Sequence, residues 1–456
     1  MNFQLTEGNI FKNLIRFSIP FLISYFLQTL YGLADLFIAG QFNGAEVITA
    51  VSVGSQIMHM LTVIIVGFAM GPAVLIGHAV GEKNPIRIRT IIFTTIILFA
   101  IIAIIFTATT TLLCKQIVKL VSTPAESVAQ TKMYLFICFA GIPFIIAYNV
   151  IASVFRGLGD SKSPMIFVAI ACAINIILDY VLMGPLKMQA KGAAIATIFA
   201  QALSVIISLI FIFCKNRKNK QNRAVKNSAP NFDAQTRIQK FSASEAKEIL
   251  KIGVPVACQD GFIQISFLII TIIANRRGVN VAAAVGIVEK IISFLFLFPS
   301  SMLSAVSAIA AQNIGAKKIE RAQKTLFYAI STGVTFGLIV AVLFQFFSQN
   351  VIGRFTTSPE VVQLGCQYIK TYVFDCVFAA IHFSFSGYFC ACGKSLYAFL
   401  HNVISIIFVR VPGAYFASVL FPQTLLPMGL AATTGSLLSS IICLIIFRRL
   451  QRKSGL

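Results

Sequence analysis

Five of the fifteen acidic residues lie inside apolar stretches long enough to cross a membrane: Asp35, Asp179, Asp260, Glu289 and Asp375. A charge at the centre of a bilayer costs on the order of 2.5–3.5 kcal/mol on insertion scales, so an acid retained there indicates a function. In that setting a carboxylate can bind a proton or a hard metal cation. These acids are therefore the first candidates for functional residues.

Polar stripes at helical spacing accompany the acids of the first half. The stripes comprise Gln28, Tyr31 and Asp35 in the first apolar segment, Asn175 and Asp179 in the fifth, and Thr197, Gln201, Ser204 and Ser208 in the sixth. Each set lies on one face of a helix. Because lipid cannot satisfy polar groups, these faces must contact protein or water.

Twelve apolar segments must position these side chains. Hydrophobic residues make up 57% of the 456 residues and charged residues only 11%, whereas soluble domains have about 25% charged residues. At about 38 residues per span and loop, the length accommodates about twelve helices. We expect them near 14–39, 47–80, 91–113, 128–155, 163–186, 192–214, 248–274, 281–314, 325–348, 361–391, 395–420 and 427–447. The composition argues against a water-soluble enzyme and predicts an all-α integral membrane protein.

The two halves of the chain repeat each other. Pro20 and Pro255 are 235 residues apart, and Gly81 and Gly315 are 234 apart. Each half holds six predicted spans, and an even number gives both halves the same orientation. Secondary transporters use such parallel repeats and bind substrate between the two halves.

The intramembrane aspartates do not follow the repeat. At the same offset, Asp35 corresponds to Ile270 and Asp375 corresponds to Gly141. Since none of the four aspartates has an acidic counterpart, the shared fold does not require them, and their presence favours chemistry. No GxxxxGK[ST] phosphate loop is present, so an ion or substrate gradient must supply the energy.

The positive charges predict the orientation. Of the 37 Lys and Arg residues, 26 fall on the side of the two termini and nine on the other side. By the positive-inside rule both termini are cytoplasmic in a multi-pass protein of the cell membrane. The basic, polar segment 215–245 reads as a cytoplasmic linker between a lobe of residues 1–214 and a lobe of residues 246–456.

Glu289 and two further embedded charges, Lys290 and Arg410, are expected to be structural. Lys290 follows Glu289, which suggests a self-compensating or interfacial pair. Arg410 lies 16 residues beyond the cytoplasmic Lys394, or about 24 Å along a helix. We expect its long side chain to reach the outer interface.

Several motifs resemble the multidrug and toxic compound extrusion (MATE) family over essentially the whole chain. One motif occurs in both halves, as Ile-Arg-Phe-Ser-Ile-Pro ending at Pro20 and as Leu-Lys-Ile-Gly-Val-Pro ending at Pro255. The others are Ala-Asp-Leu-Phe-Ile-Ala-Gly around Asp35, Val-Phe-Arg-Gly-Leu-Gly-Asp ending at Asp160, and Asn-Ile-Ile-Leu-Asp from Asn175 to Asp179. The resemblance implies a V-shaped exporter of twelve transmembrane helices, built as two parallel six-helix lobes with a central cleft.

The resemblance also implies where ions bind. In the DinF-like branch, which is the most similar, a cation site lies in the N-terminal lobe, and its residues fall here on Asp35, Asn175, Asp179 and Thr197. The surrounding polar positions of that site fall on Gln28, Tyr31 and Tyr134, and the bend of the first helix falls on Pro20. The NorM-like branch emphasises acids of helices 7 and 10, which makes Asp260 and Asp375 candidates for a substrate or ion site in the C-terminal lobe. The coupling ion is left open between a proton and sodium.

The favoured function is that of an antiporter that exports amphipathic or cationic organic compounds in exchange for a proton or sodium. The alternative is a flippase for lipid-linked oligosaccharides, which would need a cationic cavity for pyrophosphate, whereas the embedded charges are mostly acidic. The chain has no HExxH or GxSxG motif, and its cysteines and histidines lack metal-ligand spacing. We therefore expect no enzyme, metal centre or cofactor, and a monomer that meets small molecules and lipid but no nucleic acid.

Overall fold

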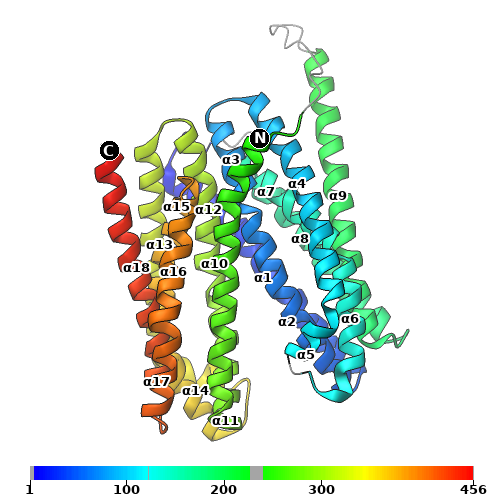
Figure 1. Cartoon of the computed structure of the whole chain (residues 1–456), viewed down its shortest axis with the longest axis vertical. Coiled ribbons are helices and arrows are strands. Elements are labelled where there is room, and N and C mark those ends of the chain that lie inside the picture. The colour runs from blue at the N-terminus through cyan, green and yellow to red at the C-terminus, as the bar shows by residue number, and fades with distance from the viewer. Residues whose placement is uncertain (1–4, 122, 226–239, 455–456) are drawn as a thin grey trace.

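The computed structural model describes residues 5–121, 123–225 and 240–454, and these residues form helices and no strand (Figure 1). Ten helices are long and apolar enough to cross a membrane, or up to twelve if each of two bent helix pairs is counted as one span. The prediction of an all-α membrane protein is confirmed. The twelve predicted segments coincide with these helices and bent pairs.

The first half of the chain forms the N-terminal lobe. Its elements are α1 (Ile10–Phe42), α2 (Ala45–Phe68), α3 (Met70–Gly81), α4 (Pro85–Leu112), α5 (Cys114–Leu120), η1 (Ala125–Ser127), α6 (Val128–Ala140), α7 (Ile142–Gly157), α8 (Lys162–Met183) and α9 (Gln189–Val225). Polar caps fix where helices begin: the Asn9 side chain accepts a hydrogen bond from the Lys12 backbone N–H at 2.9 Å, which satisfies an otherwise unpaired donor of the first turn.

The second half forms the C-terminal lobe. Its elements are α10 (Ala243–Asn275), α11 (Val279–Leu295), α12 (Leu297–Gly315), α13 (Ile319–Ile352), α14 (Pro359–Tyr372), α15 (Asp375–Ala391), α16 (Ser395–Ser405), the π-helical turn η2 (Ile406–Arg410), α17 (Val411–Leu420) and α18 (Leu426–Ser454). The predicted linker 215–245 overlaps the end of α9 and the start of α10, and its residues 226–239 lie outside the described residues.

Corresponding spans in the two lobes are broken at corresponding places. The pair α6 and α7 bends by 46° and the pair α14 and α15 by 41°. At the first break, a Cβ on Gly141 would lie 2.0 Å from the Ile198 side chain of α9, so a larger residue would force this side chain to move. The breaks give the two lobes the same internal geometry, as the sequence repeat predicts.

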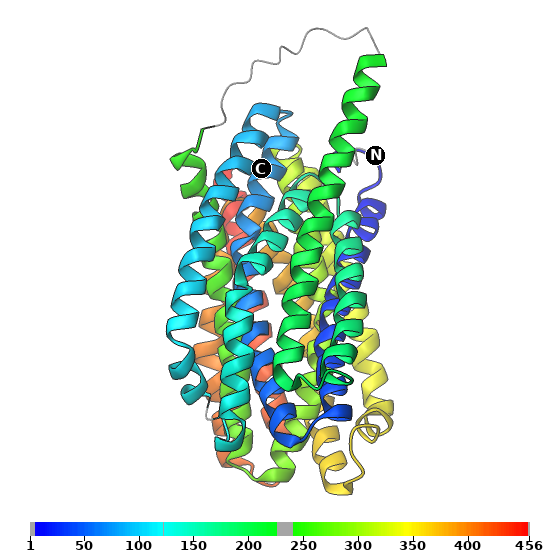
Figure 2. The same cartoon turned by 90° about the vertical axis from the view of Figure 1, so that its right-hand side faces the viewer.

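The lobes touch on the side of the two termini and separate on the opposite side (Figure 1). Figure 2 shows from a second direction that both termini lie toward the same end of the molecule. At the contact α3 packs against α12. A Cβ on Gly81 would lie 2.1 Å from the Gln312 carbonyl oxygen, and one on Gly315 would lie 2.2 Å from the His78 carbonyl oxygen. The two repeat-related glycines thus bring the backbones of the lobes together where any side chain would hold them apart.

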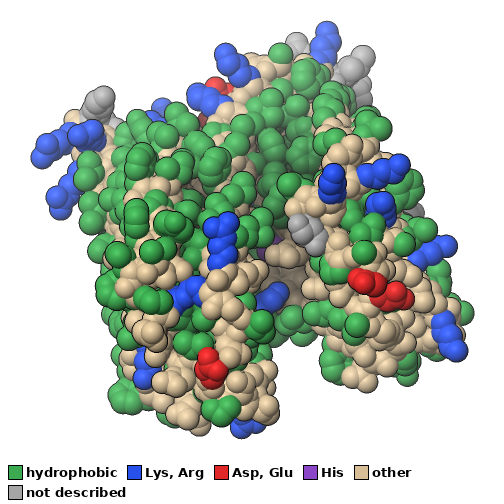
Figure 3. All heavy atoms as spheres, turned by 60° about the horizontal axis from the view of Figure 1, so that its bottom comes forward, with side chains coloured by type: hydrophobic (Ala, Val, Ile, Leu, Met, Phe, Trp, Pro, Cys, Tyr) green, Lys and Arg blue, Asp and Glu red, His purple; other side chains and the backbone are tan. Residues whose placement is uncertain are grey.

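A hollow opens between the lobes on the face opposite the termini (Figure 3). This arrangement gives the V shape expected from the resemblance. It also means that the structure captures one of the two states that an alternating-access protein must visit.

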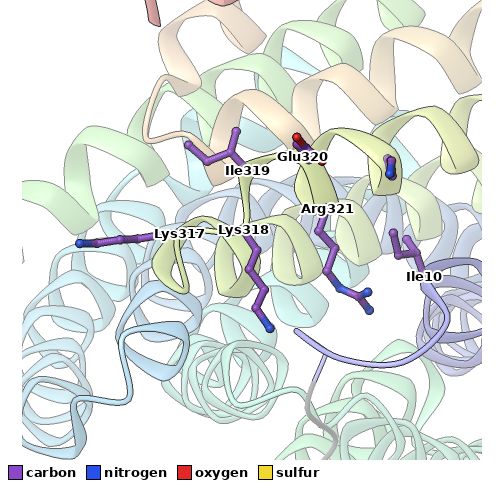
Figure 4. Close-up of a pocket in the computed structure, with 7 residues that line it drawn as sticks. Ile10, Lys317, Lys318, Ile319, Glu320 and Arg321 are labelled. Atoms are coloured by element: carbon purple, nitrogen blue, oxygen red, sulfur yellow. The ribbon is translucent and has the colours of Figure 1, made fainter. Parts of the chain in front are cut away.

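Residues 5–7 tie the N-terminal lobe to the C-terminal lobe on the closed side. Leu5 is 2% exposed and belongs to the hydrophobic core. The Asn313 amide donates a hydrogen bond to the Leu5 carbonyl at 3.3 Å, and Lys318 and Arg321 donate to the carbonyls of Thr6 and Glu7 at 3.0 and 2.7 Å. Lys318 and Arg321 project from the start of α13 beside a cavity of about 530 Å³ that Ile10 also lines (Figure 4). We call residues 5–7 the N-terminal strap.

The predicted orientation leads to a labelling result. In a protein whose exposed Cys214 and Cys258 are replaced by serine, we expect Ser228→Cys to be unreactive toward a membrane-impermeant maleimide added to intact cells, because the basic linker is retained in the cytoplasm. Thr357→Cys, on the loop before α14, should react. Efficient labelling of Ser228→Cys in intact cells would reverse the topology.

Candidate functional site

Three packed helices bring the predicted cation-binding residues of the N-terminal lobe together. Helix α8 packs against both α1 and α9, so Asp35 of α1 faces Asn175 and Asp179 of α8 and Thr197 of α9. Asp35 and Asn175 are each 2% exposed and Asp179 is 0% exposed. The i, i+4 spacing of Asn175 and Asp179 places both on the face of α8 that meets α1.

The four side chains form an oxygen-rich cluster with few internal hydrogen bonds. The Thr197 hydroxyl lies 3.5 Å from Asp35 Oδ2 and donates to the Ala193 carbonyl at 3.0 Å. Asp35 interacts with both Asp179 and Asn175. Among the described residues, however, no hydrogen-bond partner reaches Asp35 Oδ1, either carboxylate oxygen of Asp179, or either polar atom of the Asn175 amide. Buried polar groups are nearly always paired, so this cluster is suited to a small cationic guest.

The aromatic residues predicted around the site come from two helices, and both interact with Asp35. Tyr134 of α6 is 1% exposed, and its hydroxyl shares a 3.1 Å hydrogen bond with Ser55 of α2. Tyr31 lies half-buried on α1 and interacts with Asp35 and with the Gln201 amide. Gln201 belongs to a predicted polar stripe but not to the predicted cation site, and Ser55 belongs to neither.

Gln28 is half-exposed on α1 and forms no side-chain hydrogen bond that the described residues show. Pro20 is buried inside α1, which continues unbroken from Ile10 to Phe42. A proline cannot donate the backbone hydrogen bond of its turn, and the Ser24 hydroxyl donates to the Pro20 carbonyl at 2.7 Å. This turn therefore lacks one backbone hydrogen bond of a regular α-helix.

In the C-terminal lobe, the cation beside Asp375 is a side chain of the protein itself. Asp375 is 0% exposed, and the Arg410 guanidinium lies 3.4 Å from its Oδ2. Arg410 is itself only 6% exposed and donates to the Tyr372 hydroxyl at 2.7 Å. The expectation that Arg410 reaches the outer interface is wrong, because the residue turns inward toward a buried carboxylate.

Glu289 also contacts this cluster. Its carboxylate accepts a 3.1 Å hydrogen bond from Thr271 of α10 and interacts with Arg410. Lys290 is exposed and makes no ion pair with Glu289 within the described part of the chain. Adjacent residues on a helix point about 100° apart, which explains the absence of a direct contact, but Lys290 still acts electrostatically on Glu289, as Arg410 does. The expectation of a self-compensating or interfacial pair stays a prediction.

Asp260 lies apart from the other acids. It is half-buried on α10 at the contact between the lobes, where a Cβ on Gly67 of α2 would lie 3.1 Å from its Oδ2. The structure therefore does not bring Asp260 and Asp375 together into one site. Among the described residues, no cluster of three or more His, Cys, Asp or Glu side chains could hold a metal ion.

The bundle of broken and unbroken spans, its two parallel repeats and the hollow between them define a two-lobed membrane transporter. Residues 20–181 and 255–416 match the model of the MatE family, and the offset of 235 between the two matches is the offset of the sequence repeat. The chain belongs to this family of multidrug efflux transporters. Its assignment to the DinF-like branch stays a prediction.

Curated relatives align over most of the chain. It is 27% identical over 410 residues to the probable multidrug resistance protein YpnP of Bacillus subtilis (strain 168), covering 90% of this chain and 89% of that protein. It is 25% identical over 396 residues to the multidrug export protein MepA of Staphylococcus haemolyticus (strain JCSC1435), covering 86% and 84%.

Solved structures share the fold. A crystal structure of MATE in complex with MaL6 superposes with a TM-score of 0.88 at 21% identity and covers 98% of both chains. A structure of the outward-facing conformation of a multidrug resistance MATE family transporter gives a TM-score of 0.87 at 21% identity, covering 98% of this chain and 97% of that one. At this identity the likeness concerns the fold alone.

Proposed function

We propose that the protein is a secondary antiporter that exports amphipathic, often cationic organic compounds in exchange for protons or sodium ions. The observation that carries the proposal is the buried pair Asp35 and Asp179. Apart from the Thr197 hydroxyl near Asp35 Oδ2, their oxygens have no hydrogen-bond partner among the described residues, and no basic side chain of the described residues interacts with them. Two carboxylates without a counter-ion in a dry site require a positive charge. An ion moving down its gradient supplies that charge.

The donor set suits either ion. The carboxylates of Asp35 and Asp179, the amide oxygen of Asn175 and the hydroxyl of Thr197 are hard oxygen ligands, which sodium accepts. Alternatively, a proton shared by the two aspartates removes the repulsion between them. No cofactor and no nucleic acid enters this scheme, and a monomer in the cytoplasmic membrane is sufficient for it.

Export follows from the coupling of this site to the shape of the lobe. With the termini in the cytoplasm, the hollow in Figure 3 faces outward. Ion entry neutralises the pair, which lets α1 bend at Pro20, narrows the N-terminal side of the hollow and expels the substrate. Closure of the outer side then opens the cytoplasmic side, where the ion leaves and a new substrate binds. Ion and substrate thus compete through one conformational equilibrium.

The test is transport by purified protein in liposomes under separate proton and sodium gradients, with a panel of cationic, neutral and anionic amphipathic compounds. We expect export of cationic amphipathic compounds to require one of the two inward gradients and to stop when that gradient is dissipated. Gradient-independent movement of every compound, or transport of a lipid-linked oligosaccharide alone, would contradict the proposal.

A further inference from the structure

Arg410 occupies the place in the C-terminal lobe that Asn175 occupies in the N-terminal lobe. The two matches to the family model, 20–181 and 255–416, are offset by 235 residues, and this offset relates Asn175 to Arg410. It also relates Asp35 to Ile270 and Asp179 to Ala414. The C-terminal lobe therefore lacks both carboxylates of the N-terminal site and has a guanidinium where that site has a neutral amide.

The structure around Arg410 holds the guanidinium in place. Arg410 ends the π-helical turn η2, which interrupts the regular helix and is a feature common at functional sites. The guanidinium lies 5.1 Å from the centre of the Phe267 ring and 5.8 Å from that of Tyr372. With the Tyr372 hydroxyl and Asp375 as partners, three elements besides its own fix its position.

Charged and titratable groups of α11, α14 and α15 surround the pair of Arg410 and Asp375. Arg410 interacts with Asp375 of α15, with Glu289 of α11, with Tyr368 and Tyr372 of α14, and with His382 of α15. Helix α18 contributes the Ser436 hydroxyl to Asp375. Glu289 also interacts with the exposed Lys290, so Arg410 is the one buried cation among the described residues that acts on both Asp375 and Glu289. In the described part of the N-terminal site, no cation interacts with the two acids.

We propose that Arg410 is a tethered cation that fills the C-terminal counterpart of the N-terminal ion site, so that the mobile coupling ion binds in the N-terminal lobe alone. Arg410 is then a residue that sets ion stoichiometry. It pairs with Asp375 throughout the cycle, and its removal converts Asp375 into a second site for a proton or sodium. The proposal rests on the proposed coupling function for the role of the ion, but its test measures binding rather than transport.

The experiment uses the purified full-length protein with Asp35→Asn, which removes the N-terminal site. Binding of radioactive sodium and labelling of Asp375 by dicyclohexylcarbodiimide, which attacks protonated carboxyls in apolar surroundings, are measured in this background with Arg410→Gln and with Arg410→Lys. We expect Arg410→Gln to raise sodium binding or Asp375 labelling at least tenfold and a further Asp375→Asn change to abolish the gain. The matched Arg410→Lys variant, which keeps the positive charge, should behave like Asp35→Asn alone.

Two results would overturn the proposal. The first is that Asp35→Asn alone shows as much sodium binding or Asp375 labelling as Asp35→Asn combined with Arg410→Gln. A mobile cation would then reach Asp375 even when Arg410 is present. The other is a folded Arg410→Gln variant, with an unchanged thermal midpoint, that shows neither signal. If Arg410→Gln does not fold, labelling of the unaltered protein decides: an Asp375 that reacts as fast as Asp35 contradicts the proposal, and an inert one supports it. Absence of antiport in liposomes would contradict the proposed function without changing these binding results.

Discussion

Asp35→Asn should abolish gradient-driven export while the protein folds and still binds substrate. The asparagine keeps the size and hydrogen-bonding capacity of the side chain but removes the charge that attracts the coupling ion. Coupling between two sites is typically worth 1–3 kcal/mol, or about 5–150-fold, and we expect a loss of about a hundredfold because Asp35 contacts Asp179, Asn175 and Thr197. The measurement is export from proteoliposomes under an imposed gradient, beside substrate binding to the same preparation.

Substitution of one further aspartate in each lobe provides the comparison for Asp35→Asn. Asp179→Asn should match Asp35→Asn, since each aspartate is the nearest acidic partner of the other. Asp375→Asn should impair export less, because its counter-ion Arg410 belongs to the protein. Wild-type export by Asp35→Asn would refute the mechanism. If Asp375→Asn abolishes coupling while Asp179→Asn leaves it intact, the roles of the lobes are reversed.

Gly315→Ala should disfavour the state seen here. Its methyl group would lie 2.2 Å from the His78 carbonyl oxygen of the opposite lobe, and backbone cannot swing aside as a long side chain can. Overpacking a tight contact typically costs about 1–3 kcal/mol. The conformational equilibrium should therefore shift about 5–150-fold toward the state open on the side of the termini, with a parallel fall in export.

Spin labels on Glu126 and Thr357, exposed residues on the open ends of the two lobes, report this shift. The distance between them should shorten in Gly315→Ala. The matched control is Gly286→Ala on α11, where an added Cβ meets no atom within 4 Å. An unchanged distance in Gly315→Ala, with full export, would show that the glycine contact does not hold the closed side together.

The spans were predictable because the thickness of the bilayer dictates the length of an apolar helix. The breaks inside them were not. Near Ala69, Gly141 and Phe296 the hydropathy is uniform, and the sequence signal is a proline two or three residues further on. A proline alone does not locate a break, because Pro20 lies inside the unbroken α1. The sequence repeat relates Gly81 to Gly315, but only the structure shows that these two glycines lie at the same contact between the lobes.

The candidate site was predictable in the N-terminal lobe and misread in the C-terminal lobe. Asn175 and Asp179 are one turn apart, so their shared face follows from helix geometry. For Arg410, distance along the chain from Lys394 gives its depth in the membrane but not the direction in which it points. The π-helical turn η2 adds to that uncertainty because it shifts the register of the residues that follow. The correspondence between Arg410 and Asn175 across the repeat was the signal that could have indicated a buried role.

The contacts of the N-terminal strap affect where a tag can be fused to the protein. Leu5 is enclosed between the lobes, and its neighbours Thr6 and Glu7 are bound by Lys318 and Arg321. A purification tag or fluorescent protein fused at the N-terminus lies only a few residues from these contacts in the sequence, so its bulk and charge would compete with them. The helix α18 runs to Ser454 at the same end of the molecule without entering the junction. Expression vectors that place the tag after α18 should therefore yield the more faithful transport assay.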